Sequence, residues 1–68
     1  MTLDYSISMQ DKAGRVVTMY INGASIDDMV ADGYSLSEAK ECVESNTFAR
    51  VFATGDIGAD AWLIDVRC

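Results

Sequence analysis

The run "LDYSISM", residues 3–9, constrains this fold most, because apolar and polar side chains alternate through it without interruption. Such alternation is typical of a strand with one buried and one solvated face. A polar turn ending at Gly14 follows, and "RVVTMYIN", residues 15–22, then supplies β-branched and aromatic residues that favour a second strand. We predict an antiparallel hairpin. Since both faces of its second strand are fairly apolar, we expect that strand to be central in the sheet or covered on both sides.

A first helix is predicted after this hairpin. Ser25 precedes "IDDMVADG" and can cap the helix, while Asp27 and Asp28 add acids that favour a first turn. Ile26, Met29 and Val30 form a short apolar stripe. Gly33 stands where a glycine ends a helix.

A second helix is predicted to begin at a cap formed by Ser35 or Ser37, and the spacing of Ser35 and Glu38 matches a capping box. Asn46 is a plausible end for it. Its core-facing stripe is expected to consist of apolar residues at helical spacing: Leu36, Ala39, Cys42 and Val43.

The rest of the chain predicts a second hairpin, built from "TFARVFAT" (47–54), a glycine-containing turn (55–60) and "AWLIDVRC" (61–68). The expected fold is one α+β domain over residues 1–68. It has a four-stranded antiparallel sheet in the order ββ-αα-ββ, with two short helices packed on one face. Its large aromatic side chains are assigned to the core, where small chains usually place them: Phe48, Phe52 and Trp62.

The residue types present argue against catalysis. Without histidine, the chain lacks the commonest general base and zinc ligand. Two cysteines 26 positions apart do not make a structural zinc site, and the acids at Asp56 and Asp60 lack the closing ligand of a calcium loop. We therefore expect a protein that is not an enzyme and holds no cofactor or metal.

The expected location is the cytoplasm of a bacterial host cell, with reduced thiols. The N-terminal residues do not form a signal peptide, and no apolar run is long enough to span a bilayer. We therefore expect no membrane partner.

The net charge of −6, from eleven acids against five bases, points to the kind of partner. It opposes direct nucleic-acid binding, which needs clustered Lys and Arg. It favours either a basic protein partner or a surface whose charge serves solubility alone. The acids concentrate between residues 27 and 44, where Asp32, Glu41 and Glu44 have no evident role in starting a helix. The candidate partner-binding residues are these acids and one tyrosine among them: Asp27, Asp28, Asp32, Tyr34, Glu38, Glu41 and Glu44.

In size and charge, an acidic, histidine-free, cysteine-poor α+β domain of this length resembles the anti-CRISPR proteins, which are small phage-encoded inhibitors of bacterial defence. The resemblance implies that an acidic face docks on the Lys/Arg-lined channel of a CRISPR effector complex and blocks access of DNA or RNA. The six acids named above would carry that face.

A second resemblance covers about the first 45 residues. A hairpin followed by "GYSLSEAKECVES" is similar to the G-x-[ST]-L-x-E-A helix start of the HicB antitoxins, although the proline-rich segment of that family is absent. This resemblance implies the alternative function, an antitoxin or other small interaction protein that acts through a strand edge or a dimer interface. The chain would then be a monomer or homodimer, and the residues left uncovered would be Val16, Tyr20, Phe48 and Phe52.

Overall fold

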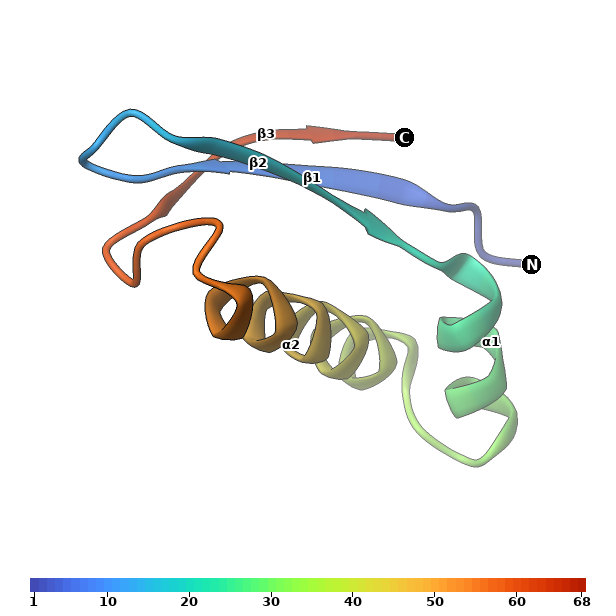
Figure 1. The fold of residues 1–68 in the computed structure, drawn as a ribbon. Coiled ribbons are helices and arrows are strands. Elements are labelled where there is room, and N and C mark those ends of the chain that lie inside the picture. The colour runs from blue at the N-terminus through green and yellow to red at the C-terminus, as the bar shows by residue number, and fades with distance from the viewer.

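The computed structural model describes all 68 residues and has the order ββ-α-α-β (Figure 1). The strands form one antiparallel sheet in the order β2-β1-β3. The α+β class is confirmed, but the predicted four-stranded sheet is wrong, because only three strands form. The elements are β1 (Tyr5–Gln10), β2 (Val16–Ile21), α1 (Gly23–Ala31), α2 (Leu36–Thr54) and β3 (Trp62–Arg67).

The first hairpin is confirmed. β1 pairs with β2 in the register Tyr5↔Ile21 to Gln10↔Val16, and the Ser8 and Thr18 hydroxyls lie 3.0 Å apart on the exposed sheet face. The expected covering of both faces of the second strand is wrong. β2 is an edge strand, and the side chains of its outer face, including Val16 and Tyr20, are exposed.

The predicted strand at 47–54 is instead the last part of α2, and this change removes the second hairpin. Phe48, Val51 and Phe52 are spaced three and four apart, which suits one side of a helix better than one face of a strand. The Thr47 hydroxyl donates to the Val43 carbonyl oxygen at 2.9 Å, so this β-branched residue is satisfied within the helix. The helix ends only at Gly55, whose φ of +76° is the left-handed conformation that glycine favours.

Of the two predicted helix starts, the first is wrong and the second is confirmed. α1 is capped by Asn22 rather than Ser25, with the Asn22 side-chain oxygen accepting from the Ala24 N–H at 2.9 Å. The helix therefore begins earlier than expected, and its acids lie beyond the first turn. At α2, the Ser35 hydroxyl oxygen accepts from the Glu38 N–H at 3.1 Å, as the capping box predicts. Gly33, with φ +108°, directly follows the C-cap of α1, as predicted.

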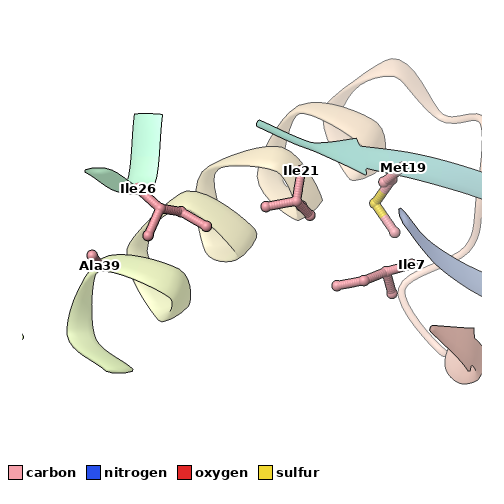
Figure 2. Close-up of a cluster of buried hydrophobic side chains, with 5 residues drawn as sticks. All are labelled: Ile7, Met19, Ile21, Ile26 and Ala39. Carbon is pink, nitrogen blue, oxygen red and sulfur yellow. The ribbon is translucent and has the colours of Figure 1, made fainter. Parts of the chain in front are cut away.

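A small core joins the sheet to both helices (Figure 2). Ala39 is buried and Val43 half-buried, as predicted, but Leu36 and Cys42 are exposed. The apolar stripe that α2 turns inward continues instead through Phe48 and Val51. The buried cluster consists of Ile7, Met19, Ile21, Ile26 and Ala39.

The last strand is much less covered than predicted. α2 lies below the sheet (Figure 1) and packs against β2, with no comparable set of contacts to β3. Trp62 is therefore 46% exposed, so its assignment to the core is wrong. Of the other two aromatics, Phe48 packs against the core as predicted, whereas Phe52 is exposed.

A buried carboxylate fixes the connection between α2 and β3. Asp11, in the β1–β2 turn, is 2% exposed. It accepts hydrogen bonds from the Arg15 N–H at 3.0 Å, the Arg15 Nε at 2.8 Å and the Gly58 N–H at 2.9 Å. Arg15 also donates to the Gly55 carbonyl oxygen at 3.1 Å, and Ile57 is buried beside this connection. These hydrogen bonds hold the α2–β3 connection against the β1–β2 turn, and β3 then pairs with β1.

Candidate acidic docking site

Three of the predicted partner-binding residues line one open groove between α1 and α2: Tyr34, Glu38 and Glu41. The Tyr34 side chain is 49% exposed, and both glutamates are exposed. Sequence reasoning missed the other lining residues, which are Met29, Cys42 and Ser45. The missed signal is the spacing along α2. Cys42 and Ser45 follow Glu38 at i+4 and i+7, which places them on the side of the helix that carries the glutamates.

Local structure positions the groove. The connection between the helices turns at Gly33, and Tyr34 comes directly before the Ser35 cap of α2. The Ser35 hydroxyl lies 3.0 Å from a carboxylate oxygen of Glu38, so the cap also orients that side chain. An exposed aromatic ring beside two carboxylates suits a cationic side chain, because a guanidinium can stack on the ring and donate to the carboxylates.

The predicted acids of α1 lie elsewhere. Asp27 accepts from the Thr2 N–H at 3.1 and 3.0 Å through its two carboxylate oxygens, and the hydrogen bonds from Thr2 hold the pKa of Asp27 below its usual range. Asp27 and Asp28 line a separate hollow with the N-terminal residues. Asp32 is the C-cap of α1. The structure therefore does not gather all seven candidates into one cleft.

Glu44 has a structural contact that the sequence did not reveal. It is half-buried and accepts a hydrogen bond from the Tyr5 hydroxyl of β1, while the Lys40 Nζ lies 5.7 Å from the centre of the Tyr5 ring. Glu44 therefore contributes to the packing of α2 against β1, although it has no part in starting a helix. Burial, together with the bond to Glu44 and its charge, raises the pKa of Tyr5.

The Tyr5–Glu44 hydrogen bond predicts how the stability of the protein changes at alkaline pH. Tyr5→Phe is expected to lower the free energy of unfolding near neutral pH by about 1 kcal/mol, through loss of one hydrogen bond. Because the folded-state pKa of Tyr5 is raised, its contribution is present below the usual tyrosine pKa, about 10, and is lost as pH rises further. Urea unfolding at pH 7 and in alkaline buffers should show wild type losing more stability than Tyr5→Phe. Equal losses in the two proteins contradict the assignment.

The acids also differ in whether the fold uses their charge. Four of the eleven acidic side chains neither accept a hydrogen bond within the chain nor form an ion pair there: Asp28, Asp32, Glu41 and Asp60. Asp28 lies on α1, Asp32 is the C-cap of α1, and Glu41 lies on α2. Each of the others has an internal donor: Asp4, Asp11, Asp27, Glu38, Glu44, Asp56 and Asp65.

The residue types that bind metals form no cluster in this chain. No group of three or more Asp, Glu or Cys side chains lies close enough together to hold a metal ion. Cys42 and Cys68 are free and exposed. Neither helix combines the length and apolar character needed to cross a membrane. No protein-family model, curated protein or solved structure matches this chain.

Proposed function

We propose that this chain is a non-catalytic binding protein that docks its acidic α1–α2 groove on a basic, nucleic-acid-binding surface of a protein partner. Occupation of that surface would block the access of DNA or RNA. The resemblance in size and charge suggests a CRISPR effector complex as the partner. The groove residues Tyr34, Glu38 and Glu41 make the direct contacts, and Asp28 and Asp32 extend the negative field along α1.

The observation that carries this proposal is the unneutralised charge of Asp28, Asp32 and Glu41. These carboxylates are exposed and have no donor within the chain, so a partner's Lys or Arg side chain can bind them without breaking a native contact. A negative surface also accelerates encounter with a basic one and makes the affinity depend on salt. Tyr34 adds an exposed ring on which a guanidinium can stack.

A matched pair of charge reversals tests the proposal. Glu41→Lys and Asp60→Lys each replace an exposed acid without an internal partner and change the net charge equally. Asp60 lies in the α2–β3 connection, away from the groove. We expect Glu41→Lys to weaken binding to the host's CRISPR effector complex about tenfold and to reduce its salt dependence. Asp60→Lys should change the affinity little.

The readouts are calorimetric affinity at two salt concentrations and competition with the effector's DNA target. Circular dichroism of both variants establishes that they are folded. If the wild-type protein does not compete with DNA, or if both reversals weaken binding equally, docking through the groove is wrong.

A further inference from the structure

The free edge of β3 is the most apolar exposed segment of the chain. β3 pairs only with β1, so its other edge has no strand beside it. Four of its six side chains are large, apolar and about half exposed: Trp62 46%, Leu63 56%, Ile64 45% and Val66 51%. Natural proteins usually protect such an edge with charge, proline or a covering element, because it can pair with another strand. Neither helix packs closely against β3, and none of its six residues is buried.

We infer that the β3 edge binds a second copy of this chain. The two β3 strands pair antiparallel about a twofold axis, so the two three-stranded sheets become one continuous six-stranded sheet. This inference does not depend on the proposed docking function. It also differs from the residues that sequence reasoning offered for a dimer interface, since none of those lies on β3.

The charge distribution favours a second copy as the occupant. Two copies with a net charge of −6 repel each other over most of their surfaces. The side chains of residues 61–68, in contrast, include one acid and one base and carry no net charge. Asp65 and Arg67 form an exposed ion pair along β3, with a carboxylate oxygen of Asp65 2.6 Å from the Arg67 Nε. The apolar edge therefore coincides with a part of the chain where identical copies meet without net repulsion.

The same two charges select a register. In an antiparallel pair related by a twofold axis, a residue one position before the axis faces the residue one position after it in the other copy. An axis at Val66 places Asp65 opposite the second copy's Arg67, and the symmetry repeats this favourable pair. An axis at Asp65 or at Arg67 would place two identical charges opposite each other. We therefore assign the axis to Val66, which pairs residues 64–68 of the two copies, so that Ile64 and Val66 are the large apolar side chains within the pairing.

Charge exchange tests both the occupant and the register. Sedimentation equilibrium over micromolar to near-millimolar concentrations should show wild type in reversible exchange between monomer and dimer. Asp65→Arg alone and Arg67→Asp alone should each weaken the dimer about tenfold, because each creates two like-charge pairs. The double exchange Asp65→Arg with Arg67→Asp should restore the wild-type affinity.

The control is Asp28→Arg, which makes the same charge change on an exposed acid of α1 and should leave the dimer in place. Far-ultraviolet circular dichroism identifies any variant that is not folded, and the double exchange keeps the test valid if one single variant unfolds. A wild-type protein that remains monomeric at every concentration overturns the inference. So does a dimer that survives both single reversals, or one that the double exchange does not restore.

Discussion

Gly23→Ala is expected to destabilise the protein by about 2–4 kcal/mol, a large fraction of the stability available to a chain of this size. The N-terminal residues cross the start of α1 at this position, where Gly23 is buried. A methyl group there would clash with the Thr2 carbonyl oxygen and lie 2.7 Å from the Thr2 carbonyl carbon. Since these are backbone atoms, no side-chain rotation relieves the overlap.

Moving the N-terminal segment away would also break the hydrogen bonds that hold it. The Gly23 N–H donates to Asp4 at 2.7 Å, and the Thr2 N–H donates to Asp27 of α1. Helix propensity alone predicts the opposite sign, because alanine is favoured over glycine in a helix by about 1 kcal/mol. The direction of the effect therefore distinguishes close packing at position 23 from local preference.

Urea unfolding followed by circular dichroism measures this effect, with Gly14→Ala as the matched control. Gly14 has φ +84° and nothing within 4 Å of an added methyl group, so only backbone strain of about 1 kcal/mol is expected. A Gly23→Ala protein as stable as wild type, or more stable, would show that the N-terminal segment does not cross α1 closely.

The parts of the fold that sequence predicts correctly depend on contacts between near neighbours. The hairpin follows from alternation in two short runs joined by a turn, and the start of α2 follows from the Ser35–Glu38 spacing. The error at 47–54 arose because β-branched and aromatic residues favour a strand locally. Spacing, the satisfied hydroxyl of Thr47 and packing of Phe48 and Val51 against the core favour the helix instead.

At the candidate site, too, the sequence predicts local features correctly and does not predict long-range contacts. The sequence indicated Glu38 and Glu41 as candidate partner-binding residues, and both are exposed on α2. It could not assign a structural contact to Glu44 or Asp27, because their donors, Tyr5 and Thr2, are 39 and 25 positions away. Contacts of that separation depend on how elements pack rather than on local pattern. These long-range hydrogen bonds determine which acidic side chains have no internal donor and can bind a partner.

Asp11 is the acid whose removal should most affect the fold. Its carboxylate accepts all three of its hydrogen bonds from groups that fix the β1–β2 turn to the α2–β3 connection. Asp11→Asn keeps the size of the side chain but replaces one of the two acceptor oxygens with an NH2 group. In either orientation of the amide, the NH2 faces an N–H donor from which it cannot accept, either the Arg15 backbone N–H or the Arg15 Nε and Gly58 N–H. We expect the thermal midpoint at neutral pH to fall by several degrees. The α2–β3 connection should also exchange its amide hydrogens faster.

The pH dependence has a definite sign. The Gly58 N–H, followed by the hydrogen bonds and charge of Arg15, holds the pKa of Asp11 below its usual range in the folded protein. A lowered folded-state pKa stabilises the fold above the usual aspartate pKa, about 3.9, and this contribution is lost as pH falls through the folded-state value. The difference in stability between wild type and Asp11→Asn should therefore be greatest near neutral pH and shrink in acid.

Denaturant unfolding at a series of pH values from neutral to strongly acidic measures this convergence. Asp60→Asn is the control, because Asp60 is exposed and has no internal donor, and it should follow wild type at every pH. The comparison isolates Asp11 from the other carboxylates, which are common to all three proteins except at the substituted position. A difference between wild type and Asp11→Asn that stays constant into strong acid would mean that the Asp11 charge does not hold β3 in place. Steric fit of the turn against Gly58 would then be the cause.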